Sequence, residues 1–213
     1  MHSIRYKTSI IILWLIFSTL IVYGSIDYLY LSNDNLFYQS FCEQLATDRI
    51  EKMIELSRKW QWIGYFLIPF FVLIRISFTS TCLYIGCFFA EHMVSFAKLY
   101  KISILADFIF VLAGTVKLII LIFFKQVSTI DDLQFQPLSL LDLFDRKSVE
   151  PFFIYPFAII NVFELLYWLT LAWLLSDLID LPFGKSLKTV SSSYGPGLAL
   201  WVLVTMFLTI NLT

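Results

Sequence analysis

Four ionisable residues lie in stretches of the sequence that are otherwise almost wholly apolar: Arg75, Asp107, Lys117 and Glu164. An uncompensated charge in the hydrocarbon of a membrane costs at least about 2.5 to 3.5 kcal/mol on insertion scales. Side chains of this kind therefore face one another or a wet cavity rather than lipid. Their types and spacing suit either an ion pair that holds helices together or a polar path through the protein.

The composition around these charges is that of a membrane protein. Of the 213 residues, 59% are hydrophobic, 18% are aromatic and 15% are charged, and the mean hydropathy is +0.81. Each membrane crossing needs about 20 apolar residues, so the length allows several spans with their loops. We expect one membrane domain over residues 1–213. The net charge is −1 and the basic residues are scattered, which excludes the pattern of a nucleic-acid-binding protein.

Five apolar blocks predict an all-α fold, a polytopic transmembrane helix bundle with about five spanning helices. The predicted spans cover residues 9–31, 60–90, 102–124, 151–175 and 194–212. The block at 60–90 contains Pro69 and Arg75. As one helix it extends about 46 Å, which suits a single tilted or kinked span rather than two crossings of about 30 Å.

The distribution of basic residues predicts the orientation of the chain. The two longest connections, 32–59 and 125–150, follow the first and third spans and so lie on one side of the membrane. Lysine and arginine near span ends mark the cytoplasmic side. Six such cations share the opposite side, namely Arg5, Lys7, Lys98, Lys101, Lys185 and Lys188. We therefore expect a cytoplasmic N-terminus and an exterior C-terminus.

Both exterior loops carry short amphipathic patterns. Phe37, Phe41 and Leu45 repeat every fourth residue, and Asp48 with Glu51 has the spacing of a helix start. The segment 139–144 in the second loop reads as another helix start with an apolar side. These short helices either pack onto their own bundle or form a site for a partner.

Depth along the helices suggests partners for the buried charges. Arg75 lies about 22 Å along the second span and Glu164 about 20 Å along the fourth, counted from the same side. We therefore expect them to pair. Asp107 lies about 8 Å from the cytoplasmic end of the third span, whereas Lys117 is about 10 Å from its exterior end and extends outward. The Arg75–Glu164 pair serves either as a clamp between helices or as part of a pathway.

Asn161 and Glu164 share a face of the predicted fourth helix, because residues three apart are neighbours on a helix. This polar face has hydrogen-bonding groups for a headgroup or an ion. No metal site is expected, since the two histidines, His2 and His92, have no ligands at useful spacing. Phosphate-binding, zinc-protease and serine-hydrolase motifs are missing from the sequence. We expect no catalytic residue and no cofactor.

The region from about residue 88 to 212 resembles the Yip1-like family of multi-pass membrane proteins. The resemblance rests on the run 94–100 before the third span, on 184–187 in the last short link, and on Gly195, Pro196 and Gly197 at the start of the last helix. It implies five spans and a non-enzymatic membrane protein. The short termini and small loops depart from the eukaryotic pattern and favour a bacterial inner membrane.

Two functions from different classes remain open. The first is a structural or accessory subunit that docks in a larger membrane complex, and it predicts a neutralised charged core without an open pocket. The second is a small transporter or channel-like protein for an ion, proton or lipid, with a wet cavity along Arg75, Asp107 and Glu164. The expected partners are membrane lipid and either a larger complex or further copies of the chain.

Overall fold

The computed structural model describes residues 2–32, 34–42, 45–144 and 148–212, and these residues form helices and loops without a β-strand. The all-α prediction is therefore confirmed. The helices are α1 (His2–Ile26), the π-helix η1 (Asp27–Leu31), α2 (Asp34–Phe41), α3 (Thr47–Phe89), α4 (Phe96–Phe123), the 3₁₀ helices η2 (Ile130–Gln134) and η3 (Leu140–Leu143), α5 (Pro151–Ile159), α6 (Val162–Ile179) and α7 (Phe183–Leu212).

Five of the described helical segments are long and apolar enough to cross a membrane, as the sequence predicted. They are Thr8–Leu31, Thr47–Phe89, Phe96–Phe123, Val162–Ile179 and Phe183–Asn211. Such a set of helices suits an integral membrane protein.

Several helices begin earlier than the apolar blocks that predicted them. The helix α3 has 43 residues, because it starts at Thr47 and includes the segment that was expected to be a separate short helix. The helix α4 starts at Phe96 rather than at 102, and α7 starts at Phe183 rather than at 194. Hydropathy gives only the length of an apolar run. These helices begin before their apolar runs, in turns that contain lysine and serine, which are compatible with a helical backbone.

The predicted fourth span, 151–175, is two helices. The break falls at Ile160 and Asn161, and Asn161 has extended backbone (φ −141°, ψ 163°). The loop before it compensates for the break, because the Leu140 N–H donates to the Ile160 carbonyl (2.8 Å) and the Val162 N–H donates to the Leu138 carbonyl (3.2 Å). Backbone groups at the break are thus satisfied, as apolar surroundings require.

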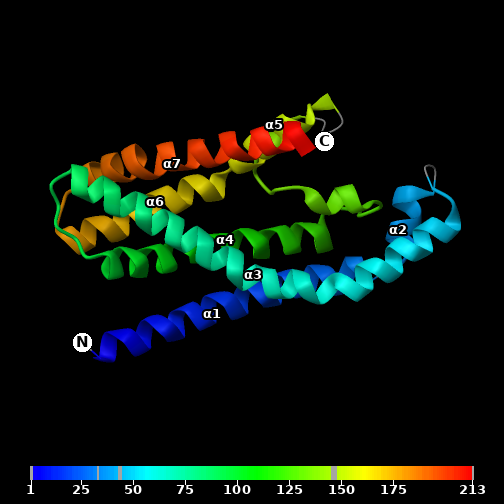
Figure 1. The fold of residues 1–213 in the computed structure, drawn as a ribbon, viewed down its shortest axis with the longest axis horizontal. Helices are drawn as coiled ribbons and strands as arrows, with labels where there is room; N and C mark the ends of the chain where they lie inside the picture. Colours follow the sequence, from blue (N-terminus) through cyan, green and yellow to red (C-terminus); the bar gives the residue numbers. More distant parts are fainter. Residues whose placement is uncertain (1, 33, 43–44, 145–147, 213) are drawn as a thin grey trace.

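Figure 1 shows the helices lying side by side along the long axis of the molecule. The N-terminus and the short links 90–95 and 180–182 lie at one end, here called the link end. The C-terminus and the long connections 32–46 and 124–150 lie at the other, the loop end. The long connections therefore share one side, as predicted. The helix α4 packs against α1, α3 and α6, and α7 packs against α3, α5 and α6.

Two hydrophobic clusters hold the helices together. The larger one joins α3, α4, α6 and α7 and includes Leu83, Leu99, Tyr167 and Val190, each fully buried. The smaller one joins α1, α3 and α4 through Leu15, Val72, Ile76 and Ile104. Both clusters lie beside the buried charges, so the charged groups sit within packed helices.

The first long connection packs onto the first turns of α3. Phe37 of α2 contacts Ile50 and Ile54, and all three are buried. The second long connection joins the same region, because the Ile130 N–H donates to Ser40 Oγ (2.8 Å). Of the two interpretations of these loops, packing onto the chain's own bundle is the one found here.

The 3₁₀ helix η2 begins with a carboxylate that accepts several hydrogen bonds. Asp132 accepts from the Ser128 N–H (3.1 Å), the Thr129 N–H (2.9 Å) and the Thr129 hydroxyl (3.0 Å), and Lys125 Nζ lies 3.7 Å away. Partial burial opposes ionisation, but these donors and the lysine together lower the pKa of Asp132 below its ordinary value.

We expect Asp132→Asn to lower the thermal stability at pH 7 and to have a smaller effect at pH 3. A carboxylate with a lowered folded-state pKa stabilises the fold above its unfolded pKa of about 3.9, and this contribution is lost as the pH falls through the folded value. Melting curves of the two proteins at both pH values test this. Asp131→Asn, at an exposed neighbouring carboxylate, is the control and changes neither curve. A difference at pH 3 as large as the difference at pH 7 contradicts the prediction.

Candidate functional site

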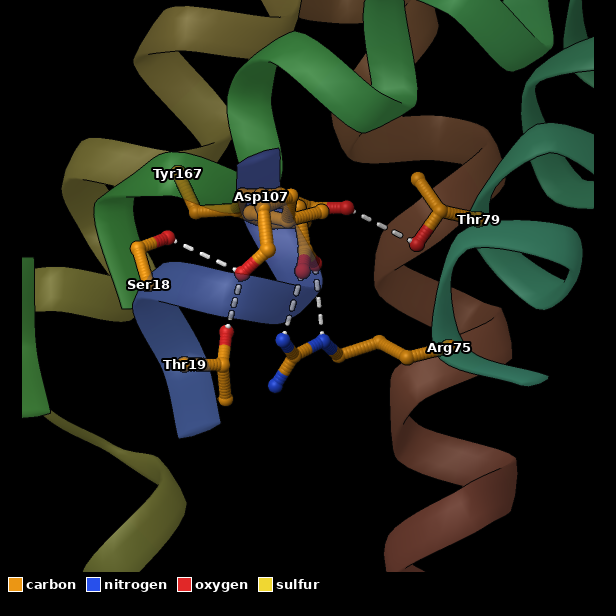
Figure 2. Close-up of polar contacts among 7 residues, drawn as sticks. Ser18, Thr19, Arg75, Thr79, Asp107 and Tyr167 are labelled. Carbon is orange, nitrogen blue, oxygen red and sulfur yellow. Dashed lines mark hydrogen bonds and ion pairs between the residues drawn. The ribbon is translucent and has the colours of Figure 1, made fainter. Parts of the chain in front are cut away.

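An ion pair joins α3 and α4 midway along the bundle. Arg75 Nε donates to Asp107 Oδ1 (2.8 Å) and Arg75 Nη2 donates to Asp107 Oδ2 (2.6 Å), as Figure 2 shows. Each carboxylate oxygen thus receives one N–H. This two-pronged geometry is the strongest form of the arginine–carboxylate interaction.

The pairing corrects the prediction that Arg75 binds Glu164. The depth of Asp107 was calculated from a third span that begins at 102, but α4 begins at Phe96. Asp107 therefore lies about 16 Å along α4 from the link end, and Arg75 lies about 21 Å from the same end of α3. The long arginine side chain covers the remaining difference, which brings the two groups together.

Aromatic side chains cover the ion pair on one side. Arg75 Cζ lies 4.2 Å from the centroid of the Phe110 ring, which is a cation–π contact. The Phe110 ring packs against Tyr167 at 4.8 Å between centroids. The Tyr167 hydroxyl donates to Thr79 Oγ1 (3.0 Å), and both residues are fully buried. These rings keep water from that side of the pair, which strengthens its electrostatic attraction.

The two partners differ in their exposure. Asp107 is fully buried, whereas the Arg75 side chain is 37% exposed. The carboxylate thus lies inside the bundle, while part of the arginine reaches its surface at the middle of a candidate span.

The helix α1 lies beside the pair with its polar groups satisfied internally. Ser18 and Thr19 both donate to the Leu15 carbonyl, at 2.9 and 2.8 Å (Figure 2). Leu15 belongs to the small hydrophobic cluster against α3 and α4. The helix therefore closes one side of the site by apolar packing.

Glu164 has hydrogen-bond donors from two helices. Its Oε1 atom accepts from Trp168 Nε1 (3.0 Å) on α6 and from the Tyr194 hydroxyl (3.0 Å) on α7. Tyr194 in turn packs against Tyr167, with 5.6 Å between ring centroids. Glu164 thus connects α6 to α7, next to the aromatic residues that cover the ion pair.

Asn161 is a helix cap and not part of a ligand-binding face. Its Oδ1 atom accepts from the Glu164 N–H (2.8 Å), and its Nδ2 donates to the carbonyls of Ala158 (2.9 Å) and Ile159 (3.0 Å). The side-chain amide therefore connects the end of α5 to the start of α6. The expectation that Asn161 and Glu164 present a shared helical face is wrong, because the helix starts between them. The Asn-x-x-Glu spacing, typical of a helix start, was the signal in the sequence.

We expect Asn161→Ala to destabilise the protein by about 1–2 kcal/mol, the usual effect of losing an N-cap side chain. Asn161→Ser keeps a capping oxygen and loses the two donated bonds without adding a charge, so its effect is smaller. Thermal unfolding in detergent micelles measures both. Equal stability of Asn161→Ala and the unmodified protein contradicts this assignment.

Lys117 lies away from the ion pair, toward the loop end. Its Nζ atom is 5.6 Å from the centroid of the Phe135 ring, in the second long connection. Lys125 approaches the same ring at 4.5 Å. The predicted network of four charges therefore includes an ion pair, a hydrogen-bonded carboxylate and a lysine beside an aromatic ring.

Asp27 lies near the end of the first apolar block and was not among the predicted site residues. In the structure the Asp27 carboxylate accepts hydrogen bonds from Gln61 and Tyr65 of α3. Nearby, the Tyr30 hydroxyl donates to the Leu121 carbonyl of α4 (2.7 Å). These contacts attach η1, which continues α1, to α3 and α4, and a lone carboxylate at a span end was the one signal in the sequence.

Among the described residues, no group of three or more histidine, cysteine, aspartate or glutamate side chains could hold a metal ion. Comparison of the chain with protein-family models, with curated proteins and with solved structures finds no match. The functional argument therefore rests on the geometry of the molecule itself.

Proposed function

We propose that this chain is a non-enzymatic integral membrane protein that serves as a structural or accessory subunit and docks in a larger membrane complex. The observation that carries the proposal is the asymmetric ion pair. Asp107 is fully buried, but the Arg75 side chain is 37% exposed at the middle of a span. An arginine side chain that is partly exposed at that depth is costly in lipid, so another polypeptide that covers it is the favourable arrangement.

The bonding of the buried charges supports a structural role over a transport path. Arg75 and Asp107 neutralise each other, and the Glu164 carboxylate accepts two hydrogen bonds. The structure has a groove between α3 and α7 at the link end and a small pocket beside Asp27. Neither is lined by Arg75, Asp107 or Glu164. A transporter for an ion or proton needs water beside such groups.

The orientation and the setting are part of the same proposal. Four lysines lie at the link end, together with the N-terminus: Lys98 and Lys101 near the start of α4, and Lys185 and Lys188 near the start of α7. Under the rule that cations mark the cytoplasmic side, this end faces the cytoplasm. We further propose a bacterial inner membrane and a Yip1-like relationship, which the sequence resemblance and the five long helices support.

Purification of the tagged chain from its native membrane in mild detergent, followed by mass spectrometry, tests the proposed function. We expect another membrane polypeptide in a fixed ratio to the chain. The Phe71→Ala variant, which alters the surface next to Arg75 on α3, should recover less of that polypeptide than Phe70→Ala.

Recovery of the chain alone contradicts the docking proposal. In that case the purified chain is placed in liposomes, and ion or proton flux that Glu164→Gln abolishes would support the transport function instead. Glu164→Gln keeps a carbonyl oxygen for the hydrogen bonds from Trp168 and Tyr194, so it separates loss of charge from loss of structure.

A further inference from the structure

A groove of about 780 Å³ opens at the link end between α3 and α7. One wall is the last part of α3, including Ile85 and Phe89, and the other is the first half of α7. Gly86 lies at a close approach of the two walls, since a methyl group added there would lie 2.6 Å from Ser193 Oγ. The two helices stay in contact farther into the bundle, where Gly197 of α7 lies against Cys82 and Phe78 of α3.

The outer part of the groove is cationic. Lys185 and Lys188 of α7 line it together with His92 of the link between α3 and α4. Both lysines are exposed, and neither is in an ion pair within the described part of the chain. The acidic residues nearest in sequence, Glu91 and Asp180, do not line the groove. The positive charge is therefore available to a ligand.

Hydroxyl groups line the next turns of α7. Thr189 donates to the Lys185 carbonyl (3.2 Å), and Ser192 donates to the Thr189 carbonyl (3.2 Å). These bonds are long for hydroxyl donors. A hydroxyl can rotate to donate to a stronger acceptor, so both side chains can turn toward an anionic oxygen.

The inner part of the groove is apolar. Ile85 and Pro196 line it there, and Phe89, the last residue of α3, adds an apolar side chain nearer the link end. Pro196 lies about 16 Å along α7 from Lys185, so the groove changes from cationic to apolar over roughly half the thickness of a hydrocarbon core. A ligand that matches both parts has an anionic head and an aliphatic tail.

We propose that this groove binds an anionic phospholipid, with its phosphate at Lys185, Lys188 and His92 and an acyl chain along Ile85, Phe89 and Pro196. The occupant is a lipid and not a free anion, because a soluble phosphate leaves the apolar half of the groove without a partner. A basic pocket between helices at the membrane boundary is a known arrangement for lipid headgroups. This inference does not depend on docking in a larger complex.

Binding of a fluorescent phosphatidylglycerol to the purified chain in phosphatidylcholine nanodiscs tests the proposal. We expect preferential binding over fluorescent phosphatidylcholine. Lys185→Ala/Lys188→Ala should weaken phosphatidylglycerol binding by about tenfold or more, because each cation near a membrane surface contributes to attraction of anionic lipid. Ser192→Trp, which fills the groove and leaves its charge unchanged, should also weaken it.

Lys98→Ala/Lys101→Ala is the matched control, because it removes two lysines from the same end of the bundle but outside the groove lining. This control should keep nearly full binding. Equal losses in the two lysine pairs, or no loss with Ser192→Trp, overturn the proposal in favour of general surface charge. Inorganic phosphate at millimolar concentration should not displace the lipid. Displacement to the level of the Lys185→Ala/Lys188→Ala variant identifies a soluble-anion site and contradicts the lipid assignment.

Discussion

Asp107→Ala is expected to destabilise the bundle by about 3–5 kcal/mol, the largest effect of any single change considered for this chain. The substitution removes both acceptors of the Arg75 guanidinium, which lie at 2.8 and 2.6 Å. The arginine then stays at the middle of a span with no carboxylate in contact with it. Because position 107 is fully buried, water cannot easily replace the lost carboxylate.

A double substitution separates the ion pair from the packing around it. In Arg75→Met/Asp107→Leu no charge remains, and replacing a buried ion pair by apolar side chains of similar volume is often neutral or stabilising. We therefore expect the double variant to be more stable than Asp107→Ala. Its loss of stability should be far smaller than the sum of the losses in Arg75→Met and Asp107→Leu. Equilibrium unfolding of the single and double variants in the same detergent gives the coupling energy.

The surface pair Arg58–Asp34 is the matched control, since its N–O distance is 2.7 Å but its side chains are 61% and 44% exposed. Asp34→Ala should cost no more than about 1 kcal/mol, as exposed ion pairs do. Two results would show that Arg75 and Asp107 are not a structural clamp. One is a loss of stability in Asp107→Ala no larger than that in Asp34→Ala, and the other is additive losses of stability from the substitutions at Arg75 and Asp107.

Gly86→Ala is expected to have the second largest effect, destabilising the protein by about 1–3 kcal/mol through overpacking. The new methyl group would lie 2.6 Å from Ser193 Oγ and closer still to Ser193 Cβ. The Cβ atom is fixed to the α7 backbone, so a side-chain rotation cannot relieve the contact. The helices α3 and α7 must separate, and the adjoining cluster around Leu83 and Val190 loses packing.

Gly64→Ala provides the control within the same helix. No atom lies within 4 Å of a methyl group added at Gly64, and alanine is more favourable than glycine in a helix by about 0.5–1 kcal/mol. Thermal unfolding should show a loss for Gly86→Ala and an equal or higher midpoint for Gly64→Ala. A loss of equal size at both positions would mean that helix propensity, not close approach, determines the result.

The sequence predicts the helix number well because membrane solvent leaves a simple signal. A run of about 20 apolar residues must form a helix in hydrocarbon, so five runs give five long helices. It predicts helix ends poorly, since lysine and serine can extend a helix beyond the apolar run. The early start of α4 at Phe96 is the example with the largest consequence.

Pairing of the buried charges depends on those ends and on helix rotation, which hydropathy does not contain. A shift of six residues moves Asp107 about 9 Å deeper, and this changes the partner of Arg75 from Glu164 to Asp107. The break before α6 was missed for a similar reason. Asn161 and Glu164 were treated as one helical face, although Asn161 caps a helix whose first turn contains Glu164.

Photo-cross-linking in native membranes tests the central claim, that another polypeptide covers the exposed part of Arg75. Phe71 lies one turn before Arg75 on the same face of α3, and it is 58% exposed. The neighbouring Phe70 is 54% exposed, but it points about 100° away from Phe71 around the helix axis. Replacing each in turn by p-benzoylphenylalanine keeps an aromatic side chain and adds a reactive group.

We predict that the probe at Phe71 cross-links one discrete membrane polypeptide and that the probe at Phe70 gives only lipid adducts. A cross-linked product of twice the mass of the chain would identify that polypeptide as a second copy. Lipid adducts alone at both positions would contradict the claim, because Arg75 would then face the bilayer in the working protein.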